Sequence, residues 1–486
     1  MKKILTTTIT ILFAVTLFAQ GSDDACLFSQ TYYQGTAKAM GMGNALGAVG
    51  GDMTAVCINP AGMGIYRSDE FTATINLMDN YVQSNYYGTT NGANRMRLSI
   101  PNLGYVNTKQ RSNYRALRST QFGIGLTRTN DFNINTQARG INPSSSKIDN
   151  YLMQMEGYSQ YDLETAFPYT IYPAWSTYLV DLYQDNLGPY YSSPVPQGNI
   201  WQGQENQFTG RSEEWSFAYS FNFSDCVFFG LSANLDHIKR NGTRTFSESS
   251  VEGDETNFNE WSFSEDLSSS ALGGNIKAGL LVHANRWLRL GAAFHSPTIY
   301  SFDESWQTET TSKIDWITRK YISPESHYEY NFISPLKWIG SMAFVIGQQG
   351  MISLDAEYTN FGAARFKTVE NDDYDYTPTN NDIKNTYGRT LNFRLGSEWF
   401  LGSSYLRLGA AYYGSPFGIG ESGGSVKKAS CGISVPVSTS TTFDFAYELT
   451  YGKTYHTLYD AGELGIEPIT QKQFKNNFAV TLKVRY

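Results

Sequence analysis

Long hydrophobic runs are what this 486-residue sequence lacks once its first 19 residues are passed. Beyond Ala19, every window of about 18 residues contains charged or strongly polar side chains, and the mean hydropathy is -0.37. A membrane-spanning helix needs about 20 consecutive apolar residues, so the sequence excludes helical spans. The chain is therefore either a soluble protein or a β-barrel.

Charge and cysteine are also scarce. Only 17% of the residues are charged, below the roughly 25% of typical soluble domains, and the net charge is -8. An acidic balance argues against nucleic acid as a partner. Four cysteines cannot form a disulfide framework in a chain of this length. Cys26 and Cys57 are placed to pair in an oxidising compartment, but unpaired structural thiols are the favoured interpretation.

The first 19 residues have the pattern of a secretory signal peptide. Lys2 and Lys3 precede an apolar run from Ile4 to Ala19, which is too short and wrongly flanked for a spanning helix. Cys26 lies seven residues beyond Ala19, which excludes a lipid anchor on a cysteine directly after the run. We expect residues 1–19 to direct Sec-dependent export.

Aromatic residues are abundant, and they alternate with small or polar residues along many short segments. They make up 15% of the chain, including 34 tyrosines. One segment places aromatic rings at every second position from Trp215 to Phe223, and the last segment does the same with apolar side chains from Phe478 to Tyr486. A period of two indicates β-strands whose two faces meet different environments.

The connections between these segments alternate between short and long. Residues 224–226 and 284–286 form short connections, whereas 241–270 and 297–335 form long ones. Tight turns at one end and long loops at the other are typical of outer-membrane barrels, which in bacteria have an even number of antiparallel strands. Fourteen strands are predicted, near 71–82, 95–107, 118–128, 213–223, 227–238, 271–283, 287–296, 336–347, 351–358, 390–400, 404–413, 427–437, 442–452 and 475–486.

The predicted fold class is all-β: a 14-stranded antiparallel transmembrane β-barrel over residues 71–486, with long extracellular loops. A basic residue on the lipid face near mid-membrane costs about 2–4 kcal/mol. The charged members of the alternating segments must therefore face the lumen, and the aromatic members must face lipid. These charged residues are Lys277, Arg394, Glu398, Asp444 and Glu448.

The second long loop, residues 130–212, has helical rather than strand periodicity. Apolar residues fall at helical spacing in two stretches, one with Ile148, Tyr151, Leu152 and Met155 and the other with Trp175, Tyr178, Leu179 and Leu182. The spacing predicts two short helices. They either pack on each other as a lid or present an outer apolar groove that receives a ligand.

Catalytic and cofactor chemistry finds little support in the sequence. The glycines at 41, 43 and 47 follow no strand, so they do not form a nucleotide-binding loop, and they are better suited to tight backbone packing in a narrow space. The five histidines lie far apart, and no metal-ligand spacing is present. No nucleophile elbow is found. We therefore expect a protein without catalytic residues, metal or cofactor, and an outer-membrane hydrolase is the weakest alternative.

The segment "DMTAVCINPAGMGIYRSDEF", residues 52–71, resembles the N-terminal hatch of the FadL-type outer-membrane transporters of long-chain fatty acids and aromatic hydrocarbons. That family carries an Asn-Pro-Ala-Gly element just before the first strand, here Asn59, Pro60, Ala61 and Gly62. The stretches "RWLRLGAAFHSPT" (286–298) and "ISLDAEYTNF" (352–361) are similar to its strand signatures, and residues 35–52 are similar to a variant found in Bacteroidetes.

The resemblance implies that residues 20–70 form a hatch, or plug, inside the barrel, with Asn59, Pro60, Ala61 and Gly62 at the gate. It further implies a monomer in the outer membrane of a Gram-negative bacterium, in contact with outer-membrane lipid and without nucleic acid. The expected function is passive, hatch-gated uptake of hydrophobic small molecules such as long-chain fatty acids. The alternative is a non-transporting barrel that docks secreted proteins, related to type IX secretion.

The family's exit is a gap in the barrel wall where the third strand kinks. Here Leu98 and Ile100 share one parity and Leu103 and Tyr105 share the other, so one residue is slipped at Pro101. This pattern predicts a bulge with a missing hydrogen-bond donor. The neighbouring strand contributes Gly123 and Gly125. Pro101, Gly123 and Gly125 are therefore the residues expected at a lateral gap.

Overall fold

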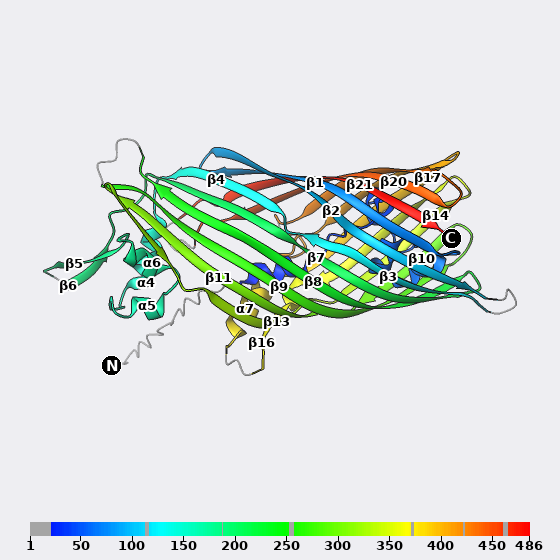
Figure 1. The fold of residues 1–486 in the computed structure, drawn as a ribbon, viewed down its shortest axis with the longest axis horizontal. Helices are drawn as coiled ribbons and strands as arrows, with labels where there is room; N and C mark the ends of the chain where they lie inside the picture. Colours follow the sequence, from blue (N-terminus) through cyan, green and yellow to red (C-terminus); the bar gives the residue numbers. More distant parts are fainter. Residues whose placement is uncertain are drawn as a thin grey trace, which may run out of the picture.

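The protein is a closed antiparallel β-barrel of 14 strands, elongated along the barrel axis (Figure 1). The computed structural model describes residues 21–111, 116–186, 188–251, 257–370, 374–420, 423–459 and 465–486. The expected signal peptide, residues 1–19, lies outside the described residues. The barrel closes where β1 (Glu70–Tyr86) pairs with β21 (Ile469–Arg485), from Glu70 opposite Arg485 to Asn85 opposite Thr470.

All fourteen predicted strands are present, and four of them are interrupted and continue as a second strand. Between β1 and β21 the wall consists of β2 (Thr89–Gln110), β3 (Leu117–Asp131) with β4 (Ile134–Asn142), β7 (Ile200–Phe223), β8 (Val227–Ser249), β9 (Phe258–His283), β10 (Leu288–His295) with β11 (Ile299–Ile314), β13 (Ser326–Ile333) with β14 (Lys337–Ile346), β15 (Gly350–Asn360) with β16 (Arg365–Thr368), β17 (Arg389–Leu401), β18 (Ser404–Tyr413), β19 (Val426–Pro436) and β20 (Thr441–His456).

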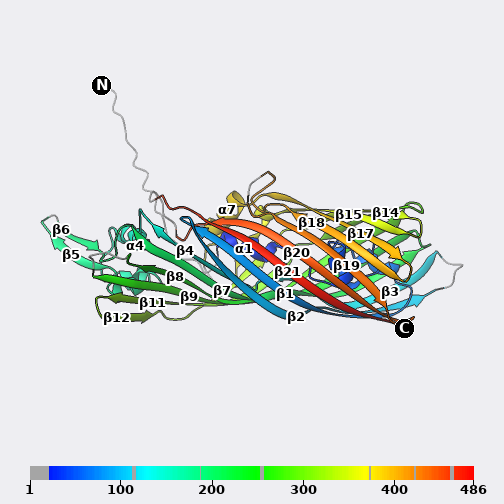
Figure 2. The same cartoon turned by 90° about the horizontal axis from the view of Figure 1, so that it is seen from above.

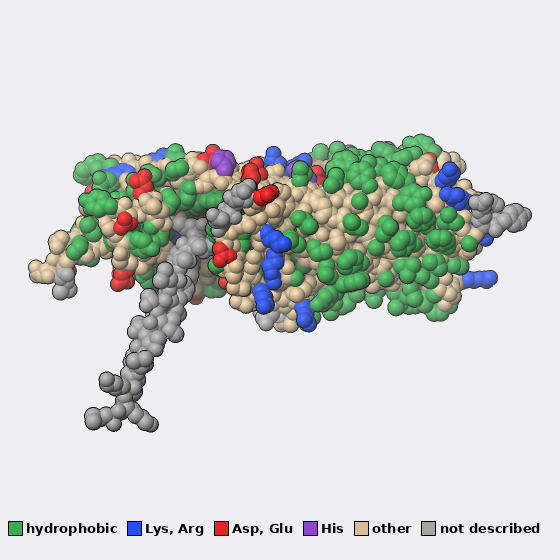
Figure 3. Space-filling view, turned by 90° about the horizontal axis from the view of Figure 1, so that it is seen from below, with side chains coloured by type: hydrophobic (Ala, Val, Ile, Leu, Met, Phe, Trp, Pro, Cys, Tyr) green, Lys and Arg blue, Asp and Glu red, His purple; other side chains and the backbone are tan. Residues whose placement is uncertain are grey.

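The two faces of the wall have the predicted orientation. Trp215, Phe217 and Tyr219 of β7 are exposed on the outer surface, whereas Arg394 and Asp444 are buried in the lumen. Figure 3 shows hydrophobic side chains gathered over one end of the barrel and more polar and charged side chains toward the other end. We call the hydrophobic end of the barrel the apolar belt. It is the part of the wall suited to lipid, because its outward apolar side chains lose no hydrogen bonds to water when lipid surrounds them.

Two of the predicted long loops are wrong, because the strands continue through them. β8 and β9 extend through most of 241–270, and 297–335 folds into β11, β12 (Ile317–Ile322) and β13. Outward positions in these extensions are polar, as at Ser301 and Asp303, because they lie beyond the apolar belt. A strand with polar residues on its outer face loses the period-two signal of a lipid-facing strand, although its backbone ladder is intact.

The second loop combines β-structure with short helices. β4 and the first part of β7 form its base, and above them are α4 (Lys147–Met155), α5 (Leu163–Ala166), α6 (Ile171–Ser176) and the hairpin of β5 (Asp181–Asp185) and β6 (Gly188–Ser192). The first predicted helix is present as α4. The second is largely wrong: α6 ends at Ser176, Tyr178 has a φ of 58°, and Leu182 lies in β5.

A smaller outer connection lies between β15 and β17. It contains the turn η2 (Phe361–Ala363), β16 and the helix α7 (Thr377–Thr386). None of the helices in the described part of the chain is long and apolar enough to cross a membrane.

The N-terminal segment enters the barrel and lies inside it (Figure 2). It forms α1 (Ser22–Ser29), α2 (Ala37–Gly41), α3 (Met53–Ile58) and the turn η1 (Pro60–Ile65) before β1 begins. Nearly every residue between 33 and 64 is buried. We refer to residues 30–69 as the hatch and treat α1 separately, because α1 lies in a different chemical environment.

Candidate functional site

The hatch contacts the wall backbone to backbone through a ring of glycines. A Cβ atom on Gly409 of β18 would lie 2.1 Å from the Gly43 nitrogen, and one on Gly396 of β17 would lie 2.4 Å from the Met42 oxygen. On the opposite side of the barrel a Cβ on Gly230 would lie 2.3 Å from the Pro60 carbonyl carbon. Side chains at these wall positions would displace the hatch, so the glycines set its close fit. The prediction that the hatch glycines serve tight packing is confirmed by Gly43, which lies against Ala410.

The Asn-Pro-Ala-Gly element is the part of the hatch that anchors it to β7, β8 and β9. Asn59 ends α3 and begins η1, and its side-chain amide donates to the carbonyl of Leu280 on β9 (3.1 Å). Ser220 of β7 donates to the carbonyl of Pro60 (2.7 Å). Pro60 occupies the first turn of η1, where its missing N–H costs nothing, and Ala61 and Gly62 are buried beside it. This geometry fixes the position of the element.

Further polar contacts hold the hatch along its length. Thr481 accepts from the Ala37 amide (2.7 Å), and Asp355 accepts from the Gly47 amide (3.1 Å). His295 donates through Nε2 to the carbonyl of Ile58 (2.9 Å). Because these contacts reach strands on several sides of the lumen, they fix the hatch to the wall in this structure.

Buried ion pairs surround the hatch, as the lumen orientation of the charged residues predicts. Lys483 bridges Asp52 of the hatch (3.4 Å) and Asp444 of β20 (2.7 Å), and Arg407 pairs with Asp444 (3.1 Å). The cavity between hatch and wall is about 40 Å³ and is lined by polar and charged side chains, including Lys277. These buried charges disfavour an apolar solute between hatch and wall, because such a solute would separate the charges from their ion-pair partners.

The barrel wall is interrupted between β2 and β3. Thr74 and Asn76 of β1 lie opposite Asn102 and Ser99 of β2, so β2 has one extra residue at this point, as the parity slip at Pro101 predicts. In the described part of the chain the β2–β3 ladder runs from Gln110 only as far as Asn102, which pairs with Thr127. We call the interruption above this pair the lateral break.

The lateral break opens because β3 bends into the lumen beyond Thr127. Residues 127–133 are all buried, in place of the in-and-out alternation of a wall strand. The bent segment pairs with the chain just after α1: the Gln34 amide donates to the Arg128 carbonyl (2.9 Å) and the Tyr32 amide donates to the Thr129 carbonyl (2.7 Å). The edge of β3 that no longer pairs with β2 therefore forms its hydrogen bonds with the N-terminal segment.

Side chains, rather than a backbone ladder, bridge the lateral break. Arg97 of β2 donates to Asn133, whose carbonyl accepts from Asn80 of β1 (2.9 Å). The buried Asn76 amide finds no hydrogen-bond partner among the described residues. Leu98 and Ile100 beside the break are exposed on the outer surface. The break therefore lies in the apolar belt, and polar side chains lie on its inner side.

Gly123 and Gly125 lie below the lateral break, in the paired part of the seam. Gly123 is opposite Val106, and Gly125 is opposite Gly104. A Cβ on Gly123 would lie 2.5 Å from the sulfur of Met63, and one on Gly125 would lie 2.3 Å from the terminal carbon of Met53. The structure thus places both glycines against the hatch and only Pro101 at the break itself.

Above the hatch the lumen contains an aromatic slot, formed by Phe302, Tyr330, Phe332 and Phe366 of β11, β13 and β16. These rings pack in stacked and edge-on pairs, for example Phe302 and Tyr330 with centroids 4.9 Å apart. The helix α1 fills the slot. Sequence patterning did not reveal it, because the slot unites strand extensions that had been assigned to loops.

The outer mouth of the barrel is closed by a packed lid made of α4, α5 and α6. Of the residues expected at an outer groove, Ile148, Tyr151 and Leu179 are buried in its core against Phe246 and Trp261 of β8 and β9. Leu152 and Trp175 are partly buried against the same core, and Tyr178 and Leu182 are exposed. The buried members of this set belong to a lid rather than to an open groove, because they find apolar partners on the strand extensions.

The buried Glu248 joins the lid to the barrel. Its carboxylate accepts from the Ser146 hydroxyl (2.6 Å), the Lys147 amide (2.9 Å), the Trp261 indole (2.7 Å) and the Gln202 amide (2.7 Å). Burial raises its pKa, and these hydrogen bonds oppose the rise. The lid is thus attached at the start of α4 through one saturated carboxylate.

Replacing Glu248 with Gln should loosen the lid, because the new NH₂ group would face donors and leave a buried group unpaired at a cost of about 1–3 kcal/mol. We expect limited proteolysis to cleave the Glu248→Gln lid between residues 156 and 162 several times faster than in the parent protein. The matched control is Glu260→Gln, an exposed outward residue paired with Lys313 at 3.9 Å. Equal cleavage rates in the two variants would contradict the role of Glu248.

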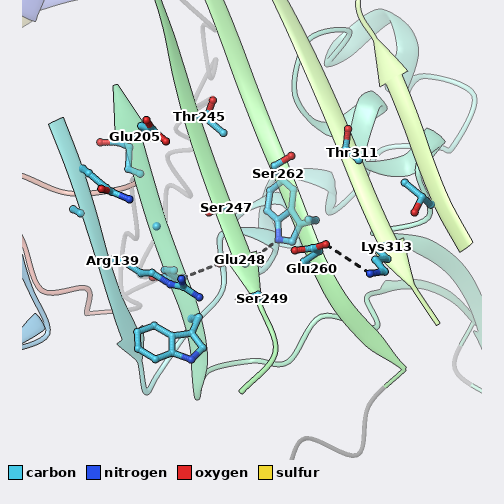
Figure 4. Close-up of a pocket in the computed structure, with 18 residues that line it drawn as sticks. Arg139, Glu205, Thr245, Ser247, Glu248, Ser249, Glu260, Ser262, Thr311 and Lys313 are labelled. Atoms are coloured by element: carbon cyan, nitrogen blue, oxygen red, sulfur yellow. Dashed lines mark hydrogen bonds and ion pairs between the residues drawn. The ribbon is translucent and has the colours of Figure 1, made fainter. Parts of the chain in front are cut away.

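A polar groove of about 490 Å³ lies on the strand extensions beyond the belt (Figure 4). Thr245, Ser247, Glu248 and Ser249 of β8 line it, whereas Phe246 between them packs in the lid core. Its polar lining makes it unsuited to an apolar ligand. Among the described residues, no group of three or more His, Cys, Asp or Glu side chains is placed to hold a metal ion, and all four cysteines, which lie in that part, are free.

Comparison with solved structures identifies the architecture. A Pseudomonas aeruginosa FadL homologue superposes with a TM-score of 0.57 at 12% identity, over 94% of this chain and 99% of that one. The toluene transporter TodX of Pseudomonas putida gives 0.53 at 12% identity over 94% and 98%, and the toluene transporter TbuX of Ralstonia pickettii gives 0.52 at 12% identity over 95% and 100%. The chain has the fold of the FadL homologue, TodX and TbuX.

This FadL-like fold is shared over almost the whole of both chains, which matches the expected resemblance. No family model matches the sequence, and no curated protein sequence matches it. At 12% identity the superposition concerns the fold alone. The chemistry of the site must be argued from the residues of this chain.

Proposed function

We propose that the protein is an outer-membrane channel for the passive uptake of hydrophobic small molecules. The solute enters from outside, reaches the lumen above the hatch and leaves sideways through the lateral break into the membrane. The observation that carries the proposal is the lateral break, a missing stretch of backbone ladder at the height of the apolar belt. A barrel without a transport function would be more stable if β2 and β3 were paired along the whole of this edge.

The fixed hatch supports a lateral rather than a vertical exit. Its backbone is interlocked with wall glycines and surrounded by buried ion pairs, whereas the lateral break is bridged only by side chains. Opening at the break therefore disrupts fewer interactions than removing the hatch. The proposed gate is thus the seam above Asn102, with the Asn-Pro-Ala-Gly element as a support of the gate and not as its moving part.

The comparisons support an apolar substrate, since the structural neighbours include toluene transporters and a FadL homologue. Long-chain fatty acids are the finer proposal that follows from the hatch resemblance. The proposal also comprises Sec-dependent export directed by residues 1–19, a monomeric barrel in contact with outer-membrane lipid, and no catalytic step.

Flux into lipid vesicles tests this function. Purified full-length protein in vesicles should accelerate the entry of toluene or a fluorescent long-chain fatty acid, with no gain in potassium conductance, because the hatch closes the aqueous path. Heat-denatured protein in the same vesicles is the control. Facilitated ion flux, or hydrophobic entry no faster than in empty vesicles, would overturn the proposal.

A second candidate is a docking barrel for secreted proteins, which the outer end of the molecule favours. The strand extensions and the β5–β6 hairpin project beyond the apolar belt (Figure 1). Exposed aromatic side chains lie there, with Trp316 between β11 and β12 and Tyr183 and Tyr190 on the hairpin. Removing the β5–β6 hairpin distinguishes the two functions, because a docking barrel would lose its activity and a hydrophobic channel would keep its vesicle flux.

A further inference from the structure

The helix α1 fills the aromatic slot as a ligand would. The Phe28 ring lies 4.7 Å from Phe302 and makes edge-on contacts with Phe132 (6.2 Å) and Phe332 (6.4 Å), measured between centroids. Ala25 and Cys26 are buried beside it. A helix of eight residues is too short to be stable by itself, so these contacts hold it in place.

The same helix presents carboxylates to donors at the edge of the slot. Asp24 forms an ion pair with Arg240 of β8 (3.1 Å), whose guanidinium lies over the Phe208 ring (4.3 Å from the centroid). Asp23 accepts a hydrogen bond from the hydroxyl of Tyr387 (2.7 Å). An arginine held flat on an aromatic ring is preorganised for a carboxylate.

The two parts of α1 have the spacing of a small amphipathic acid. Asp24 and Phe28 are four residues apart, so they share one face of the helix and are separated by about 6 Å along its axis. A ring and a carboxylate linked by three methylenes span a similar distance. A cavity of about 350 Å³ adjoins Asp24 and Leu27 and is lined by Arg240, Arg244 and Trp306.

We propose that α1 is a tethered stand-in for the ligand, and that the ligand is an aromatic carboxylate that competes with α1 for the slot and for Arg240. This inference rests on the proposed transport function and adds a substrate class to it, namely anionic aromatic molecules in preference to neutral hydrocarbons. The incoming ring replaces Phe28 and the incoming carboxylate replaces Asp24. Release of α1 then weakens the pairing of the adjoining Tyr32 and Gln34 with the bent end of β3 and loosens the lateral break, while the rest of the hatch stays in place.

Cys26 reports directly on the release of α1, because its thiol is buried only while the helix is docked. The experiment uses the full chain in detergent with Cys226→Ser and Cys431→Ser, which removes the two exposed thiols. The rate of maleimide modification at Cys26 is measured with 4-phenylbutyrate and with the neutral 4-phenylbutan-1-ol at equal concentration. Cys57, buried in the hatch, is the internal reference.

We expect saturating 4-phenylbutyrate to accelerate Cys26 modification at least about tenfold, which is a shift of one decade in the docking equilibrium. The alcohol should act far more weakly, and the rate at Cys57 should not change. Phe28→Ala should raise the Cys26 rate without any ligand and tighten binding of the acid, because the internal competitor is weakened. Arg240→Gln should erase the preference for the acid over the alcohol, and Ser22→Ala on the same helix should match the parent.

Each remaining outcome overturns one specific claim. An unchanged Cys26 rate with 4-phenylbutyrate, in protein that still carries toluene into vesicles, refutes the stand-in role of α1 and leaves the channel function intact. Equal acceleration by acid and alcohol refutes the anionic preference. Protein that admits neither toluene nor a fatty acid refutes the channel function itself, whatever the behaviour of Cys26.

Discussion

Deletion of Pro101 should reduce hydrophobic flux at least about tenfold while leaving a folded barrel. Pro101 is the extra residue of β2, and both it and Asn102 are buried, whereas Ile100 is exposed. Without Pro101, Asn102 follows Ile100 directly and the in-and-out alternation becomes regular, with Ile75 opposite Ile100. A continuous β2 can then extend its hydrogen-bond ladder with β3 and close the lateral break. A tenfold loss of flux corresponds to an increase of about 1.4 kcal/mol in the barrier to exit.

The control for this deletion is Pro101→Ala, which keeps the extra residue and only restores a backbone N–H group. It should retain flux close to that of the parent protein. Folding is verified by the mobility shift of the unheated barrel on a denaturing gel. A deletion variant that folds and transports toluene normally would show that the lateral break is not the exit.

Replacing Gly409 with Leu should dislodge the hatch and turn a closed barrel into one that leaks ions. The new Cβ would lie 2.1 Å from the Gly43 nitrogen and 2.5 Å from the Met42 carbonyl carbon, and both are backbone atoms that cannot rotate away. Overpacking typically costs about 1–3 kcal/mol even where side chains can adjust. We expect single-channel currents in planar bilayers where the parent protein shows none.

Gly340→Leu is the matched control for the hatch, since it is a wall glycine on β14 with no atom within 4 Å of its Cβ position. It should remain non-conducting. A silent Gly409→Leu barrel with the normal gel shift would contradict the view that glycine contacts seat the hatch.

The sequence was sufficient to predict the wall because lipid imposes a strict period of two. Segments such as Trp215 to Phe223 show that period, and all fourteen predicted strands are found. Beyond the belt both faces can be polar, so the extensions of β8 and β9 carried no such signal. The helix predicted through Leu182 failed because tertiary contacts of Leu179 and the turn at Tyr178 outweigh helical spacing.

The sequence predicted the candidate site only where that site interrupts the alternation of inward and outward residues along a strand. The parity slip at Pro101 located one side of the lateral break. The inward bend of β3 had no local signature, because it is stabilised by pairing between Arg128 and Gln34, which are distant in sequence. Gly123 and Gly125 were assigned to the gap because they lie on the strand next to the parity slip, but the structure places them against the hatch.

A rigid plug and a weak seam complement each other physically. The hatch must resist opening, because a lumen of this width would leak polar solutes. An apolar solute nevertheless gains about 0.8 kcal/mol for each methylene moved out of water, so it needs a path that avoids the buried ion pairs. In the proposed function the lateral break supplies such a path.

Photolabelling with a diazirine-bearing hydrocarbon tests the lateral route most directly. After illumination of the protein in vesicles, peptide mapping by mass spectrometry should place the label on residues 96–102 of β2 and on residues 127–133, which comprise the bent end of β3 and the two residues after it. Label concentrated at the C-terminal end of the hatch, around Tyr66 and its wall partner Gln121, would instead show passage through the plug and would contradict the account.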